Sequence, residues 1–260
     1  MLKYLVVAVI SLHVSFSAGA EKPMLFGTET LPPFNYLDDK GHVVGPGAEV
    51  VREVCENLTI ECQIEMYPIK RLISMMSNAE LNGIITMGKN KARERDFYFS
   101  KPYAMTQYGF FVPKAIHEDI RHISQFEDYT IVTLYGSNML ATLEDVRKRS
   151  GVDFEILTET TLQQAFKKLA FGRYQTKKIA IFSNRDIGQY IMRMSDIKQL
   201  DYRVTQKTLH YYIGLPKNAV KMEFVKAFNQ SMDKLYQNGR LQQILEKHFV
   251  KLPDQTFYMN

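Results

Sequence analysis

The feature that most constrains the fold is an alternation of short apolar strands with amphipathic helices. Apolar runs at 24–27, 62–67 and 83–87 have the length of buried strands, and apolar side chains at helical spacing lie at 50–58 and 72–76. A strand–helix–strand–helix–strand order favours a parallel sheet with helical crossovers. The first hundred residues are therefore expected to form one α/β unit.

A second unit with the same order follows. Its expected strands and helices are, in chain order, 130–134, 139–148, 154–157, 162–171 and 178–182. Two aromatic-rich strands, 108–112 and 210–215, lie where the units join. The 260 residues, 45% of them hydrophobic, suffice for one large domain or two moderate ones. A net charge of +5 does not indicate nucleic acid, because the longest basic run, 147–149, fits a solvated helix face.

The N-terminus has the pattern of a secretory signal peptide. Lys3 supplies a positive charge, 5–16 is apolar and uncharged, and Ala18-Gly19-Ala20 puts small residues at a cleavage site. The alternative is an uncleaved anchor, but the apolar stretch is shorter than the ~20 residues that span a bilayer. We therefore expect residues 1–20 to be a signal peptide cleaved after Ala20, with the mature protein in the periplasm.

The two cysteines are expected to pair. Cys55 ends a helical pattern and Cys62 begins the next strand, and two cysteines in an exported protein usually form a disulfide. A metal site is the alternative, but it needs more ligands than two thiols, and no histidine lies near them. No metal is expected.

Four loops leave the carboxyl ends of the expected strands. Ligands of open parallel sheets bind at these ends. The loops are 29–36, 86–93, 135–138 and 183–186. If the two units face each other, these loops line one cleft.

The residues of these loops resemble one protein family over essentially the whole mature chain. The resemblance is carried by Leu31-Pro32-Pro33-Phe34 with Gly41 and Gly45, by Arg93 followed by Phe99-Ser100-Lys101-Pro102-Tyr103, by Gly136-Ser137, and by Asn238-Gly239-Arg240-Leu241 with His248-Phe249. This pattern is similar to the bacterial extracellular solute-binding proteins, family 3, the receptors of polar amino-acid ABC importers. Some members have a disulfide at the spacing of Cys55 and Cys62.

The resemblance implies a two-lobed, type II periplasmic-binding-protein-like α/β fold. Two parallel-rich sheets with flanking helices would be joined by two hinge strands. Lobe 1 would be discontinuous, made of 21–112 and 208–260, and lobe 2 would be the inserted segment 113–207. The protein would be a monomer without a cofactor.

Arg93 is the first candidate for ligand binding. In the family an arginine at this position holds the ligand's α-carboxylate, and a guanidinium offers a planar fork of donors to two oxygens. The alternative is a surface arginine, since Lys89, Lys91 and Arg95 lie beside it. Asn90 stands where the family usually has threonine.

Other candidates come from the same loops. Phe34 would present a rigid apolar wall, with a core aromatic as the alternative, and Glu29, Tyr36 and Tyr67 are weaker candidates. Backbone groups of Thr86, Met87 and Gly88 would bond the ligand whatever their side chains. Amides at Ser137 and Asn138 would bind an anion at a helix N-terminus, or these residues would simply cap that helix.

The second lobe departs from the family pattern. An acidic residue that holds the α-ammonium is usual where this chain has Asn184, and Asp186 follows two residues on. A neutral side chain loses a charge-assisted contact. The expected solute is a small polar carboxylate, an amino acid or similar. The departure at Asn184 leaves two alternatives open: a carboxylate lacking a free α-amine, or an amine held by Asp186 or Glu29.

The expected function is capture of a small polar solute by hinge closure, without catalysis. The closed form would be read by an ABC permease of the inner membrane, or by a membrane kinase if the protein is a sensor. An enzyme resembling periplasmic cyclohexadienyl dehydratases is a further alternative, with Glu29, Asp186 and His210 as acid–base candidates.

Overall fold

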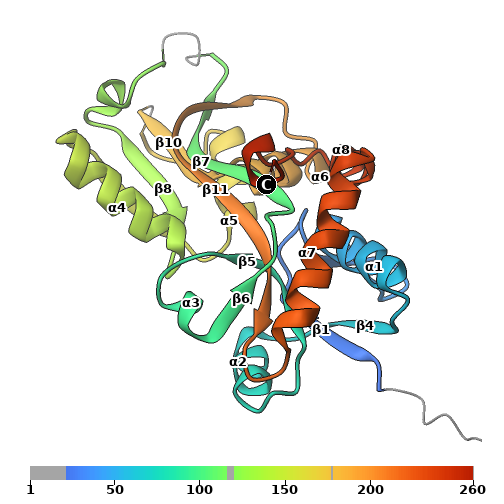
Figure 1. Ribbon diagram of the computed structural model, residues 1–260. Helices are drawn as coiled ribbons and strands as arrows, with labels where there is room; N and C mark the ends of the chain where they lie inside the picture. Colours follow the sequence, from blue (N-terminus) through green and yellow to red (C-terminus); the bar gives the residue numbers. More distant parts are fainter. Residues whose placement is uncertain (1–21, 116–119, 177, 260) are drawn as a thin grey trace, which may run out of the picture.

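A computed structural model describes residues 22–115, 120–176 and 178–259 (Figure 1). The predicted signal peptide, 1–20, lies outside the described residues. Among the residues described, no helix combines the length and the apolar character needed to cross a bilayer.

The first α/β unit, here called the β1 half, is built on three parallel strands in the order β4-β1-β5. Its elements are β1 (Met24–Thr28), β2 (Tyr36–Leu37), β3 (Val43–Val44), α1 (Pro46–Leu58), β4 (Cys62–Met66), α2 (Ile69–Ser77) and β5 (Gly83–Gly88). The β1 and β4 strands pair in register from Met24 with Cys62 to Thr28 with Met66. Strands β2 and β3 form a small separate hairpin. The expected strand and helix order is confirmed here.

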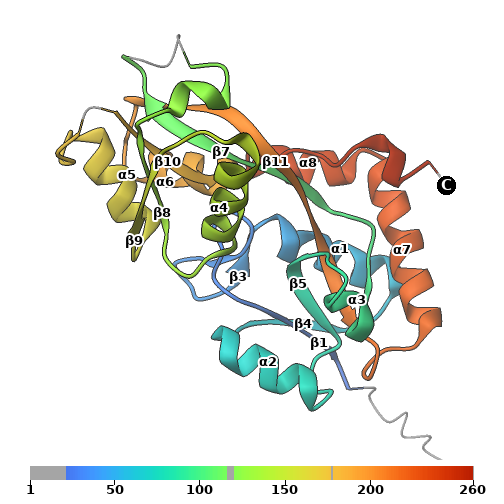
Figure 2. The same cartoon turned by 90° about the vertical axis from the view of Figure 1, so that its left-hand side faces the viewer.

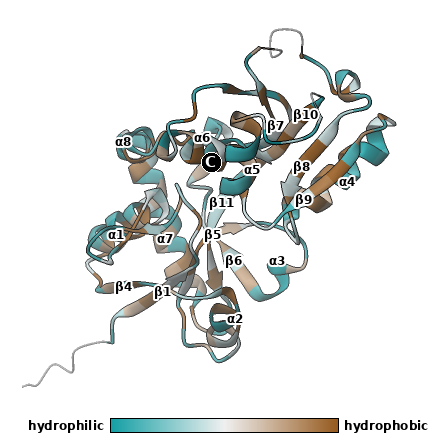
Figure 3. Cartoon of the chain, turned by 180° about the vertical axis from the view of Figure 1, so that it is seen from behind, coloured by the Kyte–Doolittle hydropathy of each residue, from teal (hydrophilic) through white to brown (hydrophobic). Residues whose placement is uncertain are grey.

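The second unit, here called the β8 half, has the parallel strands β10-β8-β9. Its elements are β8 (Thr130–Leu134), α4 (Asn138–Ser150), β9 (Glu155–Glu159), α5 (Leu162–Ala170), β10 (Ile179–Asn184) and α6 (Arg185–Met194), preceded by the 3-10 helix η2 (Ile123–Phe126). Strands β8 and β10 are largely apolar and buried, whereas the edge strand β9 and the outer face of α4 carry polar residues (Figure 3).

Two long strands connect the halves. They are β7 (Ala104–Pro113) and β11 (Leu200–Pro216), and they pair antiparallel along most of their length (Figure 2). The two sheets are hydrogen-bonded through this ribbon into one path, β4-β1-β5-β11-β7-β10-β8-β9. The remaining elements are α3 (Arg93–Asp96), β6 (Phe97–Phe99), α7 (Met222–Gln237), α8 (Arg240–Lys247) and η3 (Gln255–Phe257). The C-terminal helices α7 and α8 pack on α1, so the β1 half is completed by the end of the chain.

Strand direction shows how the halves face each other. From Ile84 to Gly88, β5 pairs with progressively earlier residues of β11, so its carboxyl end points toward the β8 half. From Ile181 to Asn184, β10 pairs with progressively earlier residues of β7, so its carboxyl end points toward the β1 half. The loops that follow the two sets of parallel strands therefore meet over the middle of the ribbon.

The register also gives the separation of these ends. Gly88 pairs with Tyr211, whereas Asn184 pairs with Tyr108, which pairs with Lys207. The two ends are thus offset by 211 − 207 = 4 residues of β11, or roughly 13 Å at the rise of an extended strand. That offset is comparable with the length of a small polar solute.

Three expected boundaries were wrong. The loop expected at 86–93 begins within the end of β5 and runs into the short helix α3, which starts at Arg93. The loop expected at 183–186 is already the end of β10 and the first turn of α6. The late strand expected at 210–215 is the end of a 17-residue strand, β11. Helix α6 was missed because its first residues, Arg185 and Asp186, fall in the segment expected as a loop, and because Gly188 in its first turns lowers helix propensity.

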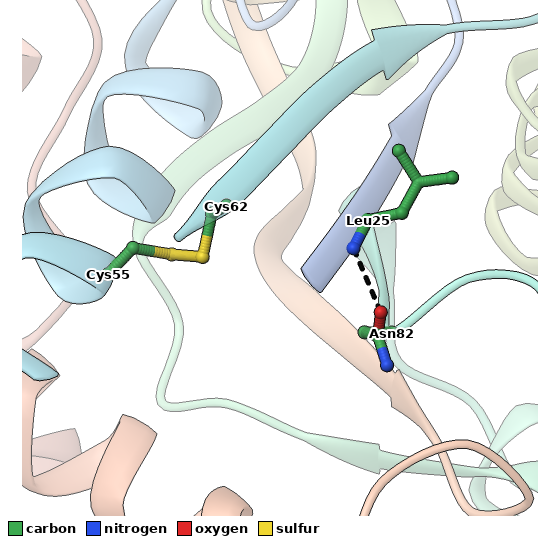
Figure 4. The surroundings of a disulfide bond; sticks show 4 residues. All are labelled: Leu25, Cys55, Cys62 and Asn82. Atoms are coloured by element: carbon green, nitrogen blue, oxygen red, sulfur yellow. Dashed lines mark hydrogen bonds between the residues drawn. A yellow bond between two sulfur atoms is a disulfide. The ribbon is translucent and has the colours of Figure 1, made fainter. Parts of the chain in front are cut away.

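Three local features stabilise the β1 half: a disulfide and a side-chain hydrogen bond near the amino ends of its strands, and a glycine where the chain enters α1. Cys55 at the end of α1 is disulfide-bonded to Cys62 at the start of β4, which confirms the expected pairing, and Asn82 Oδ1 accepts a 2.8 Å hydrogen bond from the Leu25 amide beside it (Figure 4). Gly45, with φ +111°, lets the chain turn into α1, because a Cβ there would lie 2.3 Å from the Phe34 carbonyl oxygen.

Candidate solute-binding site between the two halves

Arg93 lies at the carboxyl end of β5. Its Nη1 donates a 2.8 Å hydrogen bond to the carbonyl oxygen of Gly88, the last residue of the strand. Its backbone amide donates to Asn90 Oδ1 at 2.9 Å, so the two candidates from this loop hold each other. The residue is exposed. The guanidinium therefore folds back over the strand end with donors still accessible to a carboxylate.

Glu29 follows β1, the neighbouring strand, and is exposed. Partial desolvation raises the pKa of its carboxyl above the ordinary value, and the nearby Arg93 charge opposes that rise. The two opposite charges are close enough to interact, yet no direct ion pair joins them within the described chain. Both thus retain capacity to bind a solute.

Thr86 holds the backbone of β5 in an unusual conformation. Its φ is +64°, which a β-branched residue rarely adopts. Its hydroxyl accepts from Asn35 Nδ2 at 2.6 Å and lies 2.5 Å from the Tyr103 hydroxyl. Tyr103 is fully buried, and burial raises its pKa. An unfavourable backbone conformation persists only where the surrounding structure holds it. Here these hydrogen bonds hold the end of β5 in that conformation, next to Met87 and Gly88.

At the carboxyl end of β10, both polar atoms of the Asn184 side chain make hydrogen bonds within the protein. Its Oδ1 accepts from the amides of Asp186 and Ile187, at 2.9 and 3.2 Å, and so caps α6. The same oxygen accepts from the Thr106 hydroxyl at 2.9 Å, while Nδ2 donates to the Tyr211 hydroxyl at 3.4 Å. Asn184 is 1% exposed, so it serves here to join β10, α6 and the ribbon.

The Asp186 side chain is also buried, and its carboxylate is paired with Arg185. Arg185 Nη2 donates to both of its carboxylate oxygens, at 3.0 and 3.1 Å, and the Thr106 hydroxyl shares its one proton between Asp186 Oδ2 and Asn184 Oδ1. Arg185 Nη1 donates in turn to Gln107 Oε1 at 2.9 Å. Both charged side chains are almost completely buried, at 6% and 1% exposure. The charge of Asp186 is thus neutralised within the β8 half.

The aromatic candidates have different positions. Phe34 is fully buried and packs edge-to-face on Tyr211 with ring centroids 4.7 Å apart, so it lies in the core and not on the solvent side of the loop. Tyr36 is half-buried against Tyr190 of α6, and burial raises its pKa. The Tyr67 ring lies under the guanidinium of Arg71, 4.7 Å from its centroid.

The N-terminus of α4 carries the last two candidates. Ser137 is the N-cap: its Oγ accepts from the Leu140 amide at 3.3 Å and donates to the Leu134 carbonyl at 2.8 Å. Asn138, the first residue of the helix, is exposed. Ser137 thus caps the helix, which was one of the two alternatives for this loop, and anion binding by these amides stays a prediction.

The sequence missed the connecting residues Thr106, Arg185 and Tyr211. A detectable signal was Thr106, a polar residue on the buried face of an otherwise apolar strand. Arg185 next to Asp186 gave no signal, because adjacent residues of opposite charge are common on surfaces.

The acid–base candidates are not brought together. Glu29 lies near Arg93 and Asp186 is paired with Arg185, whereas His210 packs against Phe257, its centroid 4.7 Å from that ring. Burial lowers the pKa of His210, and Asp254, 3.9 Å from its Nε2, opposes that shift. Across the described ranges, no cluster of three or more His, Cys, Asp or Glu is placed to hold a metal.

Facing strand ends, a long two-stranded connection and an accessible guanidinium define a receptor of the periplasmic-binding-protein class. The model of the bacterial extracellular solute-binding proteins, family 3, matches residues 24–251. The chain belongs to this family.

Solved structures agree with the fold. A probable amino-acid ABC transporter extracellular-binding protein, YtmK from Bacillus subtilis, superposes with a TM-score of 0.76 at 20% identity, over 87% of this chain and 97% of that one. A mutant of ArgBP from T. maritima gives 0.64 at 20% identity, over 87% and 94%. A histidine kinase sensor domain similar to periplasmic binding proteins gives 0.64 at 17% identity, over 90% and 99%.

Proposed function

We propose that this protein captures a small polar solute bearing a carboxylate, between the β1 and β8 halves, and delivers it to an ABC importer in the inner membrane. The halves would correspond to lobe 1 (21–112 and 208–260) and lobe 2 (113–207), closing about β7 and β11. The amino-acid transport relatives support the importer as partner.

The position of Arg93 carries this proposal. The guanidinium is exposed, always charged, and held at the strand end that points toward the β8 half. A carboxylate there would accept two parallel hydrogen bonds from one planar group. The exposed N-terminus of α4 offers the solute a second positive group from the other half.

Glu29 distinguishes between the two expected solute classes. Asn184 is neutral and Asp186 is paired with Arg185, so neither offers a free carboxylate to an ammonium group. Glu29 is the exposed carboxylate beside Arg93. An amino-acid solute would therefore place both charged groups against the β1 half, whereas a simple carboxylate would need Arg93 alone.

Calorimetric titration tests the proposal. Purified mature protein is titrated with L-amino acids and, in parallel, with dicarboxylates lacking the amine. We expect one class to bind, and Arg93→Met to weaken that binding about 100-fold, the effect of losing a charge-assisted bidentate contact of roughly 2.7 kcal/mol.

Arg95→Met is the matched control. Arg95 is two residues on in the same helix, is equally exposed, and bonds the Ala92 carbonyl. It should leave the affinity unchanged. Equal losses in both variants, or no binding by the wild type to any member of the panel, would contradict the proposal.

A further inference from the structure

Two aromatic contacts join α6 to the β1 half. The Tyr190 ring of α6 lies 5.9 Å from the Tyr36 ring of β2, centroid to centroid. Three residues further along α6, the Arg193 guanidinium lies 4.6 Å from the centroid of the Phe249 ring, which follows α8. Residues three apart share a helix face, so α6 presents both groups to the same neighbour.

Each side of this contact is fixed in its own half. Gly188 of α6 packs so closely on Phe111 and Phe166 that a Cβ there would lie 2.3 Å from Phe111. On the other side, Glu49 of α1 accepts hydrogen bonds from Lys247 and His248, at 2.8 and 2.7 Å, immediately before Phe249. The contacts therefore join two separately anchored surfaces.

The contacts also span the junction that the solute would occupy. Tyr36 ends the loop that leaves the carboxyl end of β1, and α6 leaves the carboxyl end of β10. These are the ends that face each other over the ribbon. Separating the halves at this junction would separate both pairs.

The end of α8 places Phe249 for this contact. The Phe249 amide donates to the Glu246 carbonyl at 3.0 Å and the Val250 amide donates to the Leu245 carbonyl at 2.9 Å, so Phe249, with φ +58°, occupies the left-handed position of a Schellman turn. Its side chain is 67% exposed, and the Arg193 guanidinium lies over its ring in a cation–π contact.

We propose that Tyr36–Tyr190 and Phe249–Arg193 form a latch that holds the two halves together before solute binds. This inference rests on the proposed function, because it assigns the latch to the same closing movement. A latch of this kind raises the population of the closed, binding-competent state, and apparent affinity falls in proportion to that population when the latch is lost.

The test measures the distance between the halves without solute. Ser77→Cys on α2 and Ser150→Cys at the end of α4 place a spin label on each half; both positions are exposed, and the natural cysteines are already bonded to each other. Pulsed electron–electron double resonance then measures the distance between the two spin labels in the labelled parent and in Tyr190→Ala/Arg193→Ala. We expect a longer mean distance and a broader distribution in the double variant.

Arg173→Ala is the matched control. The Arg173 guanidinium lies 5.8 Å from the ring centroid of Phe171, and both residues belong to the β8 half. This substitution deletes a similar cation–π contact that lies within one half. The distance between the two spin labels should therefore stay at the parent value. Tyr190→Phe keeps the ring contact and should also match the parent, which separates the latch from a general loss of folding at this position.

The outcomes separate the two proposals. A distance distribution in Tyr190→Ala/Arg193→Ala that equals the parent's overturns the latch, whatever solute the protein binds. With the calorimetric panel, the latch predicts that the double variant loses roughly five- to seventyfold in affinity, as expected when an aromatic pair and a cation–π contact are both removed. Absence of solute binding in the parent overturns the proposed function, and the solute-free distances still report on the contacts themselves.

Discussion

The two sets of strand ends that face each other use their charged residues differently. At the end of β5, Arg93 and Asn90 are exposed and bonded mainly to backbone groups of their own loop. At the end of β10, Arg185 and Asp186 are buried and bonded to each other. One end keeps its charge accessible, and the other uses its charge to hold α6 on the ribbon.

This difference explains how a two-part receptor can combine rigidity with binding. A buried, satisfied polar network fixes the geometry of the β8 half at its junction with the ribbon. The β1 half can then present Arg93 and Glu29 without having to stabilise the fold with them. The three predictions below test whether the two ends really divide the roles in this way.

The largest expected effect is on the buried pair. Asp186→Asn leaves the Arg185 charge buried without its carboxylate, and breaking such a pair typically costs about 3 kcal/mol or more. We expect the free energy of unfolding to fall by about that amount in urea denaturation. Asp145→Asn breaks the exposed Arg149 pair on α4 and should cost less than about 0.5 kcal/mol. Equal effects of the two variants would contradict the comparison.

The disulfide gives the next largest effect, and it belongs to the β1 half alone. Cys55 and Cys62 are seven residues apart, and closing a loop of that length contributes about 2 kcal/mol in the chain-entropy model. Cys55→Ser/Cys62→Ser should lower the free energy of unfolding by about that amount. Reduction of the wild type by dithiothreitol should reproduce the loss, and it should leave the serine variant unchanged. An equally stable serine variant would show that the β1 half needs no covalent support.

The smallest effect concerns Glu29 and pH. Desolvation raises its pKa in the folded protein and Arg93 opposes that rise, so the charged form destabilises the fold above the folded-state pKa. That cost disappears as the pH falls below the unfolded-state value. Because the residue is exposed, Glu29→Gln should stabilise the protein at pH 7 by less than about 0.5 kcal/mol.

The same comparison at acid pH provides the check. Near pH 3.5 the carboxyl is largely protonated in both states, so Glu29→Gln and wild type should unfold at the same urea concentration. A gain that persists at acid pH would mean that the substitution acts through packing and not through charge.

The sequence predicted the repeated architecture well, because apolar periodicity reflects burial directly. Both β-α-β-α-β units, the disulfide and the connecting strands are confirmed. It failed at α3, which is a single charged turn, and at α6, where Gly188 interrupts a short amphipathic helix that begins with two charged residues. Those failures lie next to Asp186 and Arg93, the residues on which the two ends differ most.

The candidate site was predicted only in part for a related reason. A sequence identifies which polar residues lie near strand ends, but it does not show which partner each one takes. Phe34 and Asp186 were expected to face the solute, and they are buried in the core and in an ion pair respectively. Their partners Tyr211 and Arg185 come from packing of β11 and from the start of α6, which the local pattern does not encode.

A crystal structure with the solute identified by calorimetry tests the central claim most directly. We predict that the solute carboxylate lies about 2.8 Å from the Arg93 guanidinium nitrogens, and that Arg185 and Asp186 remain paired with each other. A solute whose carboxylate is bound elsewhere, or an Asp186 released from Arg185 to bind it, would contradict the account.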